Sequence, residues 1–186
     1  MARLVFVTGG CRSGKSGYAL SFAEKLAGPK FYIATCNPCD DEMDARVKRH
    51  KNERDSTVWK TIEEPIDLLS AMKKVENGGV VLIDCVTLWI SNLMHDLRDK
   101  NNDEIENEIL QSVRRFLFEL EKTDATVVIV SNEVGMGIAP ANDVARLFRD
   151  IAGRVNQLFA ASSGDVYFMA SGLPMILKQR GDNESS

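Results

Sequence analysis

The apolar residues of this chain fall into short continuous runs that are separated by longer stretches with helical spacing. A short run that is apolar at every position is typical of a strand buried on both faces of a sheet. We therefore predict buried strands over residues 4–7, 31–35, 80–84, 126–130 and 166–170, and a shorter strand over 59–62.

Between these runs, apolar residues recur every three or four positions, as on a helix that buries one face. Tyr18, Phe22 and Leu26 show this period, and the pair Gly28-Pro29 predicts the end of their helix. Further helices are expected over residues 41–54, 65–75, 88–97, 104–122 and 142–159. The alternation of strands and helices predicts an α/β fold with a mainly parallel sheet.

Length and composition indicate a globular protein with one domain. The chain has 186 residues, of which 44% are hydrophobic and 27% are charged. We expect a single domain over residues 1–177 and a frayed polar tail over 178–186. The net charge of −4 argues against a globally basic nucleic-acid-binding protein. No apolar run is long enough to span a membrane and no signal-peptide cleavage pattern is visible, so we expect a cytoplasmic location.

The strongest motif is a candidate phosphate-binding loop that lies between the first predicted strand and helix. Residues 9–16 match the pattern G-x-x-x-x-G-K-[ST]. In such a loop, backbone N–H groups and the helix N-terminus bind phosphate oxygens. Lys15 is expected to reach the β- and γ-phosphates of a nucleotide, and Ser16 to offer its hydroxyl to Mg²⁺. An ordinary glycine-rich turn is the alternative.

A second candidate for the magnesium site is Asp84, which ends a predicted buried strand. A carboxylate at this place organises the metal in many phosphoryl-transfer enzymes. Its alternative role is to cap the helix that follows.

A local cluster of positive charge surrounds one of the two histidines, His50, in a chain that is acidic as a whole. The cations of the cluster are Arg46, Lys48, Arg49, Lys51 and Arg54. His50 is either a half-buried helical residue beside a solvated basic face or a nucleophile that its neighbours keep uncharged. The residue pattern leaves both open. The other histidine, His95, lies in an apolar helical stretch and is expected to be structural.

The four cysteines, Cys11, Cys36, Cys39 and Cys85, are expected to be free thiols. Cys36 and Cys39 form a C-x-x-C pair, for which a zinc or redox site is the alternative. No second pair completes a zinc tetrad in the sequence, so we interpret these thiols as incidental.

Six stretches, in order along the chain, resemble the bifunctional adenosylcobinamide kinase / adenosylcobinamide-phosphate guanylyltransferase family of cobalamin biosynthesis. They are residues 8–16, 32–35, 40–46, 49–51, 131–140 and 148–157. The resemblance implies a three-layer, RecA-like P-loop NTPase fold and assembly as a homotrimer. It also implies two Mg²⁺-dependent reactions. An NTP, either ATP or GTP, phosphorylates the corrinoid adenosylcobinamide, and GMP then passes from GTP to that phosphate through a GMP–histidine intermediate.

The same resemblance assigns roles to individual residues. The guanylylated histidine of the family falls on His50. The positions that contact nucleotide fall on Gly9, Gly10, Cys11, Arg12, Ser13, Gly14, Lys15, Ser16, Ala34, Thr35, Cys36, Lys51, Asn52, Glu53, Arg54, Glu63 and Asp84. Glu133 is expected either to orient substrate or metal or to stabilise its own loop. Arg146, Arg149 and Arg154 remain unassigned, and we assign Trp59, Trp89 and the methionines to the core rather than to corrinoid contacts.

Two other functions are consistent with a phosphate loop. The first is a small-molecule kinase without guanylyl transfer, and the second is a nucleotide-dependent regulatory module with a protein partner. The simple kinase would share Lys15, Ser16 and Asp84 with the bifunctional enzyme. Only the bifunctional enzyme requires a covalent role for His50.

Overall fold

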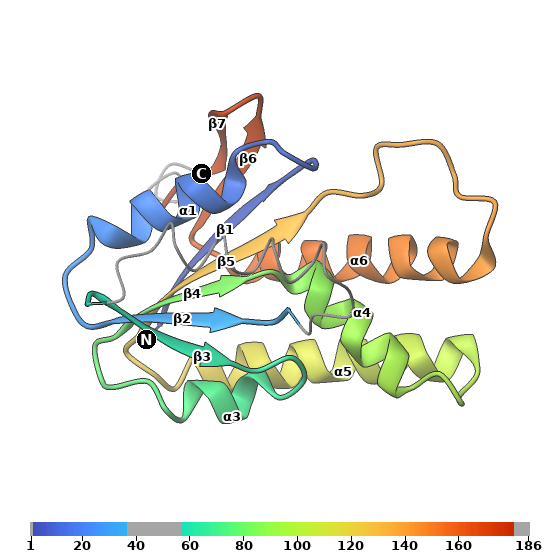
Figure 1. Ribbon diagram of the computed structural model, residues 1–186, viewed down its shortest axis with the longest axis horizontal. Coiled ribbons are helices and arrows are strands. Elements are labelled where there is room, and N and C mark those ends of the chain that lie inside the picture. Colours follow the sequence, from blue (N-terminus) through green and yellow to red (C-terminus); the bar gives the residue numbers. More distant parts are fainter. Residues whose placement is uncertain (1, 37–56, 181–186) are drawn as a thin grey trace, which may run out of the picture.

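The structure is a computed structural model that describes residues 2–36 and 57–180. Its seven-stranded sheet has the order β3-β2-β4-β5-β1-β6-β7 (Figure 1). The strands are β1 (Arg3–Gly9), β2 (Lys30–Ala34), β3 (Trp59–Glu63), β4 (Val80–Asp84), β5 (Thr126–Asn132), β6 (Asp165–Ala170) and β7 (Leu173–Lys178). The helices are α1 (Lys15–Glu24), α3 (Leu68–Met72), α4 (Val86–Asp96), α5 (Asn102–Leu120) and α6 (Asp143–Ser162).

All strand pairs of this sheet are parallel except the last. β1 lies between β5 and β6, β4 lies between β2 and β5, and β7 runs antiparallel to β6. The predicted α/β fold with a mainly parallel sheet is therefore confirmed. Because parallel strands end at the same edge, the loops after β1, β2, β3, β4 and β5 all emerge on one side, where α/β sheets bind their ligands.

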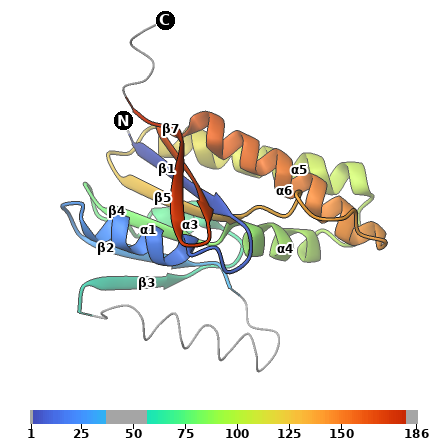
Figure 2. The ribbon, with the colours of Figure 1, turned by 90° about the horizontal axis from the view of Figure 1, so that it is seen from above.

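The sheet is covered on both faces, which makes three layers. One set of strand residues, including Phe6, Ile83 and Ile129, packs against α3, α4, α5 and α6. The alternate residues, including Val7 and Val130, pack with α1 on the opposite face. Figures 1 and 2 show α1 and α5 on opposite sides of the sheet. Continuous apolar runs form these strands because both faces are buried.

The helix that was expected over residues 65–75 is shorter, from Leu68 to Met72. The Glu64 carboxylate accepts hydrogen bonds from the backbone N–H groups of Ile66 and Asp67, so Pro65 lies in a turn. Asp67 then caps the helix by accepting a bond from the N–H of Ser70. The helix that was expected over 41–54 lies outside the described residues.

The sequence prediction assigned no element to residues 171–177, where the structure has β7. Ser171 and Gly172 form the tight turn before it, with positive φ values of 51° and 84°. β7 is an edge strand whose apolar side chains are exposed, so it lacks the alternation of a half-buried strand. Lys178, the last residue of β7, donates to the carbonyl of Ala161, and residues 181–186 of the predicted tail lie outside the described residues. Among the described helices, none is both long and apolar enough to cross a membrane.

A buried carboxylate joins the first strand to the C-terminal hairpin. Asp165 is 2% exposed, accepts two hydrogen bonds from the Arg3 guanidinium and a third from the backbone N–H of Arg180. We expect Asp165→Ala to lower the free energy of unfolding by about 3 kcal/mol, because it leaves these donors unpaired. Urea unfolding measures the change.

The control for this prediction is Asp150→Ala, which removes an exposed carboxylate beside Arg149. Exposed ion pairs stabilise by less than about 1 kcal/mol, so this variant should unfold almost as the wild type does. Equal effects of the two substitutions would contradict the anchoring role of Asp165.

Candidate nucleotide-binding site

The predicted phosphate loop connects β1 to α1, as the motif requires. Gly9 and Gly14 have positive φ values of 154° and 89°. A Cβ atom on Gly9 would lie 2.5 Å from the carbonyl oxygen of Met169, and one on Gly14 would lie 3.2 Å from the Cα of Gly172. The loop therefore needs glycine at both positions. Arg12, at its tip, also has a positive φ, of 56°.

The side chain of Lys15 bonds back to the start of the phosphate loop. The Lys15 side chain is buried, and its Nζ donates to the carbonyl oxygen of Gly10 at 3.0 Å. α1 begins at Lys15 with no acidic residue in its first turn, so its N-terminus retains an unopposed positive dipole end. Ser16 follows in this first turn. The arrangement provides a cation, a hydroxyl and a helix N-terminus for one group of phosphates.

Two other parts of the fold support this loop from outside. The backbone N–H of Gly172, in the β6–β7 turn, donates to the carbonyl of Ser13 at 2.9 Å. The N–H of Glu133, just after β5, donates to the carbonyl of Gly9 at 3.0 Å. Sequence analysis missed the contribution of Gly172, although the Ser-Gly pair between two apolar runs is a hairpin signal that indicates this turn.

Three predicted nucleotide-contacting residues end neighbouring strands. Ala34 of β2 lies in register with Glu63 of β3 and with Asp84 of β4. Strands lie about 4.8 Å apart, so β4 is displaced by about 10 Å and β3 by about 19 Å from the phosphate-loop strand β1. Asp84 is thus on the side of the phosphates, whereas Glu63 can meet only the far end of an elongated ligand.

The carboxylate of Asp84 accepts a hydrogen bond from the hydroxyl of Tyr32 at 2.9 Å. This bond, between residues on adjacent strands, fixes the carboxylate at the carboxyl edge, and sequence analysis did not find it. A serine hydroxyl and a carboxylate are oxygen donors of the kind that Mg²⁺ prefers. Ser16 and Asp84 therefore fit the metal that the sequence predicts.

Thr35, another predicted nucleotide contact, is fully buried and joins the ends of β2 and β4. Its hydroxyl donates to the carbonyl of Cys85 at 2.8 Å and accepts from the N–H of Cys85 at 2.9 Å. Its carbonyl accepts from the amide of Asn92. Thr35 thus holds the edge on which Ala34 and the half-buried Cys36 lie.

The described cysteines are free thiols. Burial raises the pKa of Cys85 to about 11, so this thiol stays protonated at neutral pH. Within the described ranges, no group of three or more His, Cys, Asp or Glu side chains is placed to hold a metal ion. Cys39 lies outside those ranges, so the interpretation of the C-x-x-C pair remains a prediction.

The end of β5, between β1 and β4, carries a polar network. The side-chain amide of Asn132 donates to the hydroxyl of Thr87 at 2.7 Å, which connects β5 to the start of α4. Asn156 of α6 donates to the backbone carbonyl of Asn132 and accepts from the hydroxyl of Ser131. The Glu133 carboxylate accepts from the N–H of Gly135 at 2.6 Å, which is the loop-stabilising role considered for it.

The three arginines that were left unassigned form bonds within the chain. Arg146 donates to the carbonyls of Pro140 and Ala141, and it also pairs with Asp143. Arg149 and Arg154 pair with the carboxylates of Asp150 and Glu106, respectively. Each of the three therefore has an acceptor within the chain.

Both tryptophans and the methionines were predicted to lie in the core. Trp59 and Trp89 are buried, as expected. The assignment of the methionines to the core is wrong for Met136 and Met175, which are 80% and 54% exposed. Methionine is apolar, but Met136 lies in the loop after β5 and Met175 lies on the edge strand β7, where both side chains are exposed.

The predicted nucleophile and its neighbours lie outside the described residues. These are His50, Lys51, Asn52, Glu53 and Arg54. Their roles remain predictions. His95 lies in the last turn of α4 and is exposed rather than part of the core.

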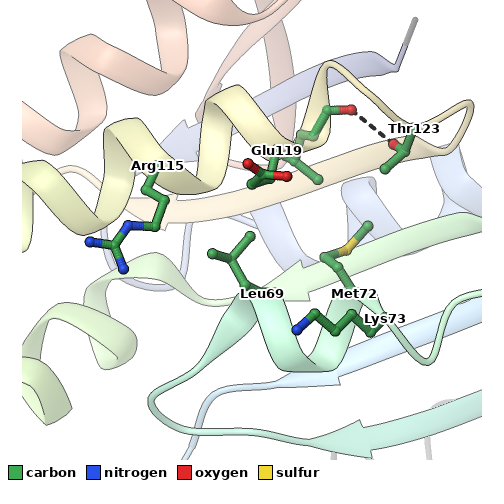
Figure 3. Close-up of a pocket in the computed structure, with 7 residues that line it drawn as sticks. Leu69, Met72, Lys73, Arg115, Glu119 and Thr123 are labelled. Carbon is green, nitrogen blue, oxygen red and sulfur yellow. Dashed lines mark hydrogen bonds between the residues drawn. The ribbon is translucent and has the colours of Figure 1, made fainter.

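A cavity of about 360 Å³ lies between α3 and α5, apart from this site (Figure 3). Arg115 and Glu119 of α5 line it together with Leu69, Met72 and Lys73 from the other side. α3 is followed along the chain by β4, and α5 by β5, so the cavity lies near the edge of the sheet at which these two strands begin. The phosphate loop lies at the opposite edge, where β1 ends. None of the predicted nucleotide-binding residues lines it.

Comparison with known proteins identifies a similar fold and several similar sequences. The fold of this chain is similar to the solved structure of an ATPase from the type III secretion system of pathogenic bacteria. The similarity covers 96% of this chain and 57% of the ATPase chain, with a TM-score of 0.54 and 9% sequence identity. The chain thus spans less than two thirds of that structure, and the likeness shows a shared fold alone. It agrees with the predicted P-loop NTPase architecture.

Sequence relatives extend over nearly the full chain. The bifunctional adenosylcobalamin biosynthesis protein CobU of Escherichia coli is 40% identical, over 94% of this chain and 99% of that protein. The corresponding protein CobP of Pseudomonas aeruginosa is 36% identical, over 92% of this chain and 95% of that protein. The family model of cobinamide kinase / cobinamide phosphate guanyltransferase matches residues 5–177. This chain therefore belongs to the cobinamide kinase / cobinamide phosphate guanyltransferase family of transferases.

Proposed function

We propose that this enzyme phosphorylates adenosylcobinamide with ATP or GTP and then transfers GMP from GTP to adenosylcobinamide phosphate. The observation that carries this proposal is a phosphate loop with a buried Lys15 in a chain that matches the family over residues 5–177. In the first step, the substrate hydroxyl attacks the γ-phosphorus, loses its proton and displaces the nucleoside diphosphate. The products of the second step are adenosyl-GDP-cobinamide and pyrophosphate.

In the kinase step the chain positions the triphosphate and neutralises its charge. The glycines of the loop let backbone N–H groups approach the phosphate oxygens, and the Lys15 ammonium lies beside the same loop. Ser16 and Asp84 would hold Mg²⁺, which neutralises charge on the transferred phosphate when it is bound. Such positioning supplies most of the acceleration in phosphoryl transfer.

The guanylyl step uses the same loop in a different way. We propose that a ring nitrogen of His50 attacks the α-phosphorus of GTP and that pyrophosphate leaves. An oxygen of adenosylcobinamide phosphate then attacks the phosphorus of the GMP–His50 adduct and releases the imidazole. Lys15 and the N-terminus of α1 would stabilise the leaving pyrophosphate, because its charge grows where the β- and γ-phosphates are bound.

We also propose that the enzyme is a homotrimer. Supporting this, β7 is the last strand of the sheet and exposes the large apolar side chains Leu173, Met175, Ile176 and Leu177. An exposed, apolar edge strand is a template for association with another chain. Its preceding turn contacts the phosphate loop at Ser13, so an interface here would lie next to the nucleotide.

Incubation with radiolabelled GTP tests the proposed function. With Mg²⁺ and adenosylcobinamide, the label from [γ-³²P]GTP should pass to the corrinoid. Without a corrinoid, the label from [α-³²P]GTP should stay on the denatured protein and be lost in acid, as for a phosphoramidate. EDTA should abolish both. Transfer of γ-label without any protein-bound α-label would instead support a simple kinase, and hydrolysis alone would support a regulatory module.

A further inference from the structure

We propose that the loop between β5 and α6, residues 133–142, binds the corrin ring of the substrate through Met136 and Ile138. This inference rests on the proposed function, because it assigns the second substrate to a place beside the phosphate loop. It concerns binding of the ring, whereas the kinase chemistry takes place at a hydroxyl on one of the arms of the substrate.

The two side chains are exposed although their loop is tied at both ends. Met136 is 80% exposed and Ile138 is 98% exposed. At the start of the loop, the Glu133 carboxylate accepts from the N–H of Gly135, and at its end the Arg146 guanidinium donates to the carbonyls of Pro140 and Ala141. Large apolar side chains held out in this way indicate a binding surface.

The loop starts where the transferred phosphate is expected. Its first residue, Glu133, donates its backbone N–H to the carbonyl of Gly9, and Asn132 lies in register with Gly9 on the neighbouring strand. A hydroxyl that attacks the γ-phosphorus must come within about 3.5 Å of it. The body of the substrate then lies immediately beyond the carboxyl edge, from which this loop extends outward (Figure 1).

The chemistry of the loop fits the corrinoid and not the nucleotide. Residues 134–142 contain no charged side chain, so they offer no cation to pair with a triphosphate. A corrin ring, in contrast, has broad apolar faces that gain from contact with thioether and aliphatic groups. Apart from its two chain neighbours, Gly137 has no atom within 4 Å of the position of a Cβ, so the rest of the described chain leaves this part of the loop uncovered.

The experiment compares two acceptors in the kinase reaction. One is adenosylcobinamide, and the other is N-acetyl-1-amino-2-propanol, which carries the hydroxyl without the ring. Affinity changes about fourfold for each methylene removed from an apolar contact. We therefore expect Met136→Ser and Ile138→Ser each to raise the KM for adenosylcobinamide about tenfold. The kcat/KM for the short acceptor and the formation of the GMP adduct should not change.

Phe118→Ser is the matched control, because Phe118 is 60% exposed on α5, away from this loop. It should leave the KM for adenosylcobinamide unchanged. An unchanged KM in both loop variants, or an equal loss with both acceptors, would overturn the proposal. So would a fall in oligomeric mass by light scattering, which would make the loop an interface between copies. If the wild-type enzyme phosphorylates neither acceptor, the proposed function itself fails.

Discussion

Lys15→Ala is expected to reduce both the kinase and the guanylyltransferase rates by about a hundredfold or more. Lys15 is a buried cation in the phosphate loop, and its Nζ lies 3.0 Å from the carbonyl oxygen of Gly10. Loss of one charge-assisted phosphate contact costs about 1.5–3 kcal/mol in binding. The cost rises in the transition state, where charge moves onto the leaving group in both reactions.

The matched control for this variant is Lys25→Ala, which removes an exposed lysine just after the end of the same helix. Its rates should equal those of the wild type. Steady-state kinetics with GTP and adenosylcobinamide measure the first reaction, and intact-protein mass measures formation of the adduct. Rates of Lys15→Ala within about threefold of the wild type, in a variant with an unchanged thermal unfolding curve, would contradict the assigned role.

Features that depend on adjacent residues could be predicted from the sequence. The phosphate loop is one, because Gly9, Gly14 and Lys15 act through backbone geometry within eight residues. The buried strands are another, since β1, β4 and β5 each contain four consecutive apolar residues. The carboxyl end of such a strand is recognisable without a structure, and this placed Asp84 correctly at the edge of the sheet.

Features that depend on distant partners could not be predicted. Tyr32 bonds to Asp84 across 52 residues of sequence, and Thr35 bonds to Cys85 across 50. Only the pairing of β2 with β4 brings them together. The exposure of Met136 was missed for a related reason: composition gives the hydrophobicity of a side chain but not whether another element covers it.

His50→Ala is expected to separate the two proposed activities. A phosphoramidate bond to GMP requires an imidazole nitrogen, so the adduct and the guanylyl transfer that depends on it should be abolished. The kinase step needs the phosphate loop, Mg²⁺ and the substrate hydroxyl, and the loop itself is formed by residues 9–16 between β1 and α1. Phosphorylation of adenosylcobinamide should therefore continue, at a rate within about tenfold of the wild type.

The measurement is the intact mass of the protein after incubation with GTP and Mg²⁺, followed by peptide mapping under alkaline conditions that preserve phosphoramidates. His95→Ala is the control, because it removes the other histidine of the chain, which is exposed at the end of α4. This variant should keep the adduct. An adduct that persists in His50→Ala, or that maps to another residue, would refute the nucleophile. Loss of both activities in a folded His50→Ala protein would instead indicate that the imidazole binds the nucleotide in both reactions.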